Sequence, residues 1–99
     1  MDMKTTSEYM ALLRKYMVEN AHKYGIMRMG IFGSVARQEN REDSDLDIVV
    51  DIDNPTLSTM YTLKTVLTEM FHCEIDLVRF RSSLPPFLKQ NIEKEAIYV

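Results

Sequence analysis

Amphipathic segments alternate with short apolar runs along this chain, and that alternation restricts its fold more than any other feature. Thr5 and Glu8 form a candidate capping box, and Gly25 stands where the segment that they open would end. Between them, apolar residues recur at helical spacing at Tyr9, Leu13, Tyr16, Met17, Ala21 and Tyr24. The spacing predicts a first helix that ends near Tyr24.

Three apolar runs are too short for helices and read as strands. The first covers residues 26–32 and stops at Gly33-Ser34. The second covers residues 45–52, and the third covers residues 74–80, where polar and apolar residues alternate. We expect these three strands to lie in one sheet.

Two further helices flank the third predicted strand. Asn54-Pro55 breaks the second strand, after which apolar residues share one helical face at Leu57, Met60, Leu63, Leu67, Met70 and Phe71. Pro85-Pro86 opens a shorter helix, and Ala36-Arg37 forms a helical turn in the polar segment after the first strand. The order helix, strand, strand, helix, strand, helix indicates an α/β (α+β) fold, with a small mixed sheet backed by helices.

The length of 99 residues suits one domain, residues 1–99, and leaves no room for a second substrate-binding domain. We therefore expect the acceptor of any reaction to be held partly by another chain. Lys and Arg number 12 against 15 Asp and Glu, which gives a net charge of -3 and disfavours a long nucleic acid as the main partner. A small triphosphate stays compatible, because a metal ion can bridge it to acidic residues.

The chain shows no sign of export or of a membrane span. Its single Cys73 cannot form an internal disulfide, and no apolar run approaches the ~20 residues that span a bilayer. Charged and polar residues follow Met1, so no secretory signal is indicated. We expect a cytoplasmic protein.

Acidic residues mark the second and third predicted strands. Period-two alternation places Asp45 and Asp47 on one face, while Leu46 points to the other, toward the helices. Asp76 joins them if its strand is a neighbour in the sheet. Because clustered carboxylates repel one another unless a cation lies among them, the pattern indicates a site for Mg²⁺. Two such ions would stabilise the attacking and leaving oxygens of a displacement at phosphorus.

Gly33-Ser34 complements these acids from the triphosphate side. Glycine lets the backbone approach phosphate oxygens, and the N–H groups and the serine hydroxyl can donate to them. Arg37 has two open roles: it can reach the same phosphates, or it can hold the loop through Asp43 or Asp45. The loop role is slightly favoured.

Each of these features alone is more often structural. A lone Gly-Ser is usually a turn, a lone Asp-x-Asp is usually solvated or capping, and a lone Asp in a strand is usually an edge residue. Their combination in this order is much less expected by accident, and it is the combination that indicates a nucleotide site.

The combined pattern resembles a known family. The chain reads G-S-x-A-R from Gly33, S-D-x-D from Ser44 and I-D-L-V from Ile75, which is similar to the minimal nucleotidyltransferase (MNT) domains of the DNA polymerase β-like superfamily. The resemblance covers nearly the whole chain. It differs at Gln38, where members commonly have glycine; the difference bears on the following loop and not on the metal ligands.

The resemblance implies a polymerase β-type palm fold and assigns the site residues. Gly33 and Ser34 would bind the triphosphate, and Asp76 would be suited to act as general base. The implied catalytic and metal-binding acids are Asp45, Asp47 and Asp76.

Freestanding MNT proteins of this length resemble the antitoxins of HEPN/MNT toxin–antitoxin pairs. The implied activity is nucleotidyl transfer, in which AMP passes from ATP to a hydroxyl of the partner HEPN toxin, expected to be that of a tyrosine. One alternative is a non-catalytic binding module that neutralises its partner by contact. Another is an antibiotic-modifying enzyme, which would need a substrate domain that this chain lacks.

Overall fold

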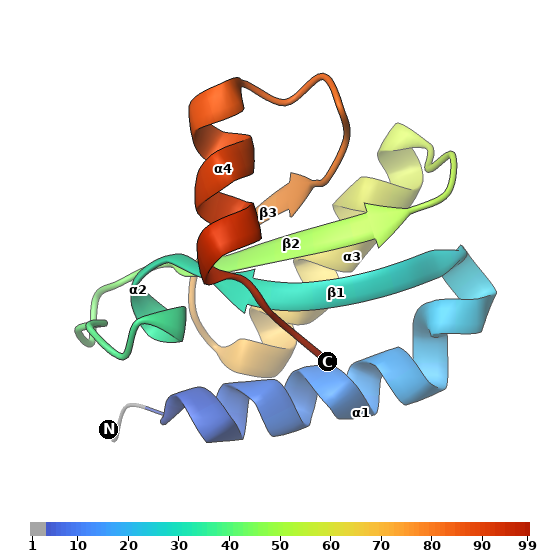
Figure 1. Cartoon of the computed structure of the whole chain (residues 1–99). Helices are drawn as coiled ribbons and strands as arrows, with labels where there is room; N and C mark the ends of the chain where they lie inside the picture. The colour runs from blue at the N-terminus through green and yellow to red at the C-terminus, as the bar shows by residue number, and fades with distance from the viewer. Residues whose placement is uncertain (1–3) are drawn as a thin grey trace.

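The computed structural model describes residues 4–99 and places a four-stranded mixed sheet between helices (Figure 1). Met1, from which we inferred that no secretory signal is indicated, lies outside the described residues. In chain order the elements are α1 (Thr6–Tyr24), β1 (Ile26–Phe32), α2 (Gly33–Ala36), β2 (Leu46–Ile52), α3 (Leu57–Phe71), β3 (Ile75–Arg79), α4 (Pro86–Glu95) and β4 (Ile97–Tyr98).

The predicted start and end of the first helix are confirmed. The Thr5 side chain accepts a hydrogen bond from the Glu8 N–H, and the Glu8 carboxylate accepts one from the Thr5 N–H, so both halves of the capping box are present. Gly25 ends α1 in the left-handed conformation, with φ of 71°. From there the chain turns directly into β1.

The sheet has the strand order β3-β2-β1-β4. β1 pairs antiparallel with β2, and β2 pairs parallel with β3. β2 is therefore an inner strand, and its start lies between the end of β1 and the start of β3. This junction brings the two acid-bearing strands together.

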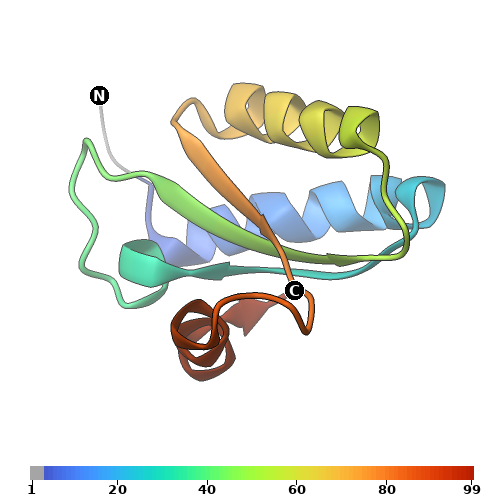
Figure 2. The same ribbon diagram turned by 90° about the horizontal axis from the view of Figure 1, so that it is seen from above.

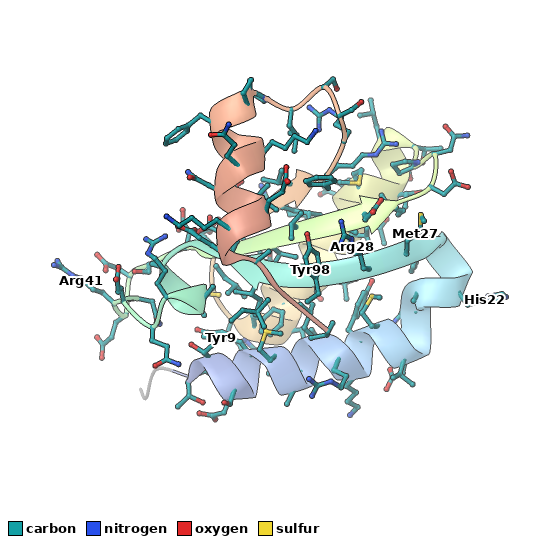
Figure 3. The ribbon with its side chains drawn as sticks, in the orientation of Figure 1. Tyr9, His22, Met27, Arg28, Arg41 and Tyr98 are labelled. Atoms are coloured by element: carbon teal, nitrogen blue, oxygen red, sulfur yellow. The ribbon has the colours of Figure 1, made fainter. Side chains whose placement is uncertain are left out.

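Helices cover both faces of the sheet, as Figure 2 shows from above. α1 and α3 pack on one face, where the Tyr9 ring lies 5.6 Å from the Phe71 ring and points toward the sheet (Figure 3). On the other face, Ile92 of α4 and Leu84 of the segment before α4 form a buried cluster with Val49 of β2. Within residues 4–99, none of the helices has the length and apolar character needed to cross a membrane.

The strand starts differ slightly from the prediction. β2 begins at Leu46 and not at Asp45, because the ladder to the third strand opens where the Leu46 N–H donates to the Glu74 carbonyl at 2.9 Å. β3 accordingly begins at Ile75. The predicted helical turn exists as α2, but it starts at Gly33, so the Gly-Ser pair opens this helix.

A fourth strand was not predicted. β4 is the two-residue tail Ile97–Tyr98, which pairs antiparallel with β1 at Gly30 and Ile31. A Cβ on Gly30 would lie 2.7 Å from the Ile97 carbonyl oxygen, so only glycine admits the tail at this distance. The short strand holds the end of α4 close to the end of β1.

Candidate active site

The acids predicted from the sequence lie at the start of β2 and β3. Asp47 and Asp76 are direct partners in the parallel register, and Asp45 precedes β2. Asp47 is half-buried, whereas Asp45 and Asp76 are exposed. The structure thus brings two of the predicted carboxylates together across neighbouring strands, with the third beside them.

Burial of the opposite strand face fixes where Asp47 points. Leu46, Ile48 and Val50 are almost fully buried in the core against α1 and α3, so the predicted direction of Leu46 is confirmed. Alternation along β2 then turns Asp47 to the face that carries Val49 and α4. Rotating Asp47 into the α1/α3 core would expose three apolar side chains, so its position is set by the packing of the strand.

The carboxyl of Asp47 is strongly perturbed. Burial is the main cause, and the carboxylates of Asp76 and Asp45 add to it, so the pKa of Asp47 rises from 3.8 to about 6. A hydrogen bond between the carboxyls of Asp47 and Asp76 acts in the same direction, and the charge of Arg37 opposes it. A site that disfavours its own negative charge in this way favours a bound cation.

The donor set fits a Mg²⁺ ion that arrives with a substrate. Within residues 4–99 no three His, Cys, Asp or Glu side chains already converge as a complete metal cluster. Mg²⁺ is usually held by one or two carboxylates together with water and substrate phosphates. The carboxylates of Asp45, Asp47 and Asp76 are hard oxygen donors of this kind, and phosphate oxygens would have to complete the coordination.

The Gly-Ser pair lies directly against these acids. Phe32, the last residue of β1, pairs with Asp47, so Gly33 is the next residue beside the carboxylate. Gly33 has φ of 73°, and a Cβ there would collide with the Asp47 Oδ2 atom. Only glycine therefore fits at this contact between the start of α2 and the acids. Ser34 follows it and is half-buried.

Arg37 does not make the loop contacts that the sequence favoured. Its guanidinium pairs with neither Asp43 nor Asp45: Nε donates to Glu39 at 3.1 Å, and Nη1 donates to both carboxylate oxygens of Glu95 at 3.0 Å. Arg41, in the loop after α2, projects outward from the sheet (Figure 3). The prediction named the wrong partners because Arg37 faces the end of α4.

Glu95 is the residue near the site that sequence reasoning missed. Its Oε2 atom also accepts from the Gly33 N–H at 3.3 Å, so one carboxylate joins Gly33 to Arg37. Glu95 is separated from Arg37 by 58 positions and belongs to no motif with it. No local spacing could have revealed this contact, which depends on how α4 packs against α2.

Comparison with known proteins shows the family of the chain. The family model described as Polymerase beta, Nucleotidyltransferase matches residues 15–99, which include every site residue described above. The chain belongs to this nucleotidyltransferase family. The resemblance inferred from the sequence motifs is confirmed.

Relatives align with this nucleotidyltransferase over its whole length. A candidate protein adenylyltransferase of Methanocaldococcus jannaschii is 38% identical over 98 residues, which are 98% of this chain and 100% of the relative. The protein adenylyltransferase MntA of Thermococcus cleftensis is 34% identical over 100 residues and is covered completely, as is this chain.

Solved structures share the fold of this nucleotidyltransferase. A candidate minimal nucleotidyltransferase has a TM-score of 0.78 and 33% identity, with 98% of each chain covered. A toxin-antitoxin with AMP-PNP has a TM-score of 0.73 and 22% identity, over 89% of this chain and 69% of that one. A complex of tri-AMPylated Shewanella oneidensis HEPN toxin with MNT antitoxin has a TM-score of 0.69 and 20% identity, over 95% and 71%. At the lower identities the likeness shows the fold alone.

Proposed function

We propose that this nucleotidyltransferase is a Mg²⁺-dependent protein adenylyltransferase that moves AMP from ATP to a hydroxyl of a HEPN-domain toxin, and so acts as an antitoxin in the cytoplasm. One observation carries the proposal: Asp47 and Asp76 face each other across β2 and β3, with Gly33 packed against Asp47. Triphosphate and acceptor groups can then meet at one carboxylate cluster. The acceptor hydroxyl is expected to be that of a tyrosine.

Relatives of this chain support the assignment. Both relatives described above carry the name protein adenylyltransferase. One of the similar solved structures is a complex that contains an AMPylated HEPN toxin. The toxin-antitoxin neighbour with AMP-PNP supports an adenine nucleotide as the substrate.

The proposed reaction is an in-line displacement at the α-phosphorus. The acceptor oxygen forms a bond to this phosphorus, the bond from the α-phosphorus to the bridging oxygen breaks, and pyrophosphate leaves. Gly33 and Ser34 would hold the triphosphate tail through N–H and hydroxyl donors. When bound, Mg²⁺ held by Asp45, Asp47 and Asp76 would neutralise charge that develops on the phosphoryl oxygens and on pyrophosphate.

Asp76 is the carboxylate best placed to accept the acceptor's proton. It is exposed and lies on β3, at the edge of the sheet, where a partner can approach. Asp47 lies on an inner strand and is half-buried. Removing the proton matters because a tyrosine hydroxyl has a pKa of about 10 and is a poor nucleophile while protonated.

Asp76→Asn should therefore lower turnover much more than it lowers ATP binding. We expect a loss of about a hundredfold in the rate of transfer and less than about threefold in ATP affinity. Asp76 would hold the ion nearest the acceptor hydroxyl and take its proton, while Asp45 and Asp47 would keep the ion that binds the triphosphate. Single-turnover kinetics and calorimetric titration with Mg-ATP measure the two quantities separately. An equal loss in both would place Asp76 in substrate binding and contradict the assigned role.

The proposed function is tested on the partner. Native chain, a cognate HEPN toxin and Mg-ATP are incubated together, and the toxin is then examined by intact-mass spectrometry. We expect one or more AMP adducts with the native chain and none with Asp47→Asn. If the toxin is neutralised without an adduct, and Asp47→Asn neutralises it equally well, the chain is a binding module and the enzymatic proposal is wrong.

A further inference from the structure

The Glu95 carboxylate occupies donors that a triphosphate would need. Gly33, which we assign to the triphosphate, and Arg37, for which contact with the phosphates is the role still open, are both engaged. The Gly33 N–H donates to Glu95 Oε2 at 3.3 Å, and Arg37 Nη1 donates to both Glu95 oxygens at 3.0 Å. A backbone N–H provides a single hydrogen-bond donor. A phosphate oxygen can therefore accept from the Gly33 N–H only if Glu95 gives it up.

Charge adds to this competition. Asp47 lies beside Gly33, with Asp76 and Asp45 close by, so Glu95 contributes a further negative charge to an acidic region. The positive charge of Arg37 is shared between Glu95 and Glu39. A polyanion approaching this region meets Glu95 as a repelling charge that also neutralises a nearby cation.

The fold lets Glu95 withdraw without a large rearrangement. Glu95 is the last residue of α4, whose position is fixed by the fully buried Ile92 and by the pairing of β4 with β1. The Glu95 side chain is 21% exposed and that of Arg37 is 44% exposed. Because the backbone is held from both sides while the carboxylate reaches solvent, rotation of one side chain suffices to release the donors.

From these contacts we propose that Glu95 is an internal competitor of the triphosphate and sets the affinity of the site for nucleotide. The inference rests on the proposed function, since it concerns the same nucleotide site. With no nucleotide bound, Glu95 holds Gly33 and Arg37; with nucleotide bound, it turns to solvent and its place is taken by phosphate oxygens. It acts on affinity and not on the chemical step.

The test removes the charge and then the whole carboxylate. Glu95→Gln keeps a neutral acceptor for the Gly33 N–H, whereas Glu95→Ala removes it. We expect calorimetry to show Mg-ATP binding about fivefold tighter for Glu95→Gln, the scale of one partly exposed ion pair, and at least as tight for Glu95→Ala. The rate of transfer at saturating ATP should stay within about twofold of that of the native chain, so KM changes and kcat does not.

Glu93→Gln is the matched control. Glu93 lies on the same helix and is exposed, so this substitution removes the same charge from a nearby place. We expect its ATP affinity to change less than about twofold. Thermal unfolding of each variant shows whether it remains folded.

Selective labelling of glycine follows the contact itself. The chain has 3 glycines, so ¹⁵N-glycine labelling resolves the amide of Gly33 from those of Gly25 and Gly30. Mg-ATP should shift the Gly33 signal in the native chain, and the signal of the nucleotide-free Glu95→Ala protein should already differ from the native one. Gly25, at the far end of β1, serves as the internal reference.

Inorganic tripolyphosphate separates failure of this inference from failure of the proposed function. If the native chain binds Mg-ATP, and the Glu95 variants bind it equally or more weakly, Glu95 supports Arg37 and the inference is overturned. If no variant binds Mg-ATP, the proposed function fails, and tripolyphosphate decides the role of Glu95. Tighter tripolyphosphate binding by Glu95→Gln supports the competition, and unchanged binding overturns it.

Discussion

Asp47→Asn is expected to reduce AMP transfer by about a thousandfold or more while leaving the metal-free protein at least as stable as the native one. Asp47 is the inner carboxylate of the cluster, in contact with Gly33 and paired with Asp76. Asparagine keeps the shape of the side chain but removes the charge that a metal ion requires. The catalytic loss therefore needs no loss of structure.

The difference in stability between Asp47→Asn and the native chain should also depend on pH, in a defined direction. The pKa of Asp47 is about 6 in the folded chain against an ordinary value of 3.8, so between about pH 4 and pH 6 the folded state keeps a proton that the unfolded state has released. Stability of the native chain thus falls as pH rises through this window. The mutant has no carboxyl to ionise at this position. With solvent screening allowed for, its free energy of unfolding should exceed that of the native chain by about 1 kcal/mol at pH 7 and by almost nothing at pH 4.

Asp53→Asn is the control for both measurements. Asp53 is exposed just after β2, so the same substitution there should leave transfer and stability nearly unchanged. Chemical denaturation in the presence of chelator, at pH 4 and pH 7, gives the free energies of unfolding. A large loss of stability in Asp47→Asn without metal would show that Asp47 is a structural residue.

ATP binding is expected to require a divalent cation. We expect excess chelator to weaken the affinity for ATP by about a hundredfold, because the triphosphate would then face the carboxylates of Asp45, Asp47 and Asp76 with no ion between them. Calorimetry with ATP, in Mg²⁺ or Mn²⁺ and then in chelator, measures the difference. Chelator already saturated with Mg²⁺ is the control for an effect of the chelator itself.

Equally tight ATP binding in excess chelator would contradict this account of the acids. It would mean that Gly33, Ser34 and Arg37 hold the nucleotide without help from a cation. The carboxylates of Asp45, Asp47 and Asp76 would then need another role.

The sheet and the acidic face could be predicted because they depend on local pattern. The capping box at Thr5 and the alternation around Asp47 are each set within a few residues, and the structure confirms both. Asp47 and Asp76 were expected to meet only if their strands were neighbours. β2 and β3 are neighbours, and their parallel register pairs the two residues. Local hydrophobic periodicity was enough for Asp47 because its neighbours Leu46 and Ile48 are both buried against α1 and α3.

The remaining features depend on contacts that are distant in sequence. β4 is too short to show a period, and it pairs with β1 only because Gly30 leaves room for the Ile97 carbonyl. The partner of Arg37 was predicted wrongly because nearby acids were weighed and Glu95, at the end of α4, was not. Neither feature has a signal in its own segment of the chain.

The central claim is that the α-phosphoryl group of ATP passes to the partner, and a labelling experiment measures this most directly. A HEPN toxin is incubated with the native chain, Mg²⁺ and ATP that carries ³²P either at the α-phosphate or at the γ-phosphate, and the label retained on the toxin is counted. Nucleotidyl transfer predicts label from α-labelled ATP, none from γ-labelled ATP, and none from either with Asp47→Asn. Label from γ-labelled ATP, or a neutralised toxin with no label from either nucleotide, would contradict it.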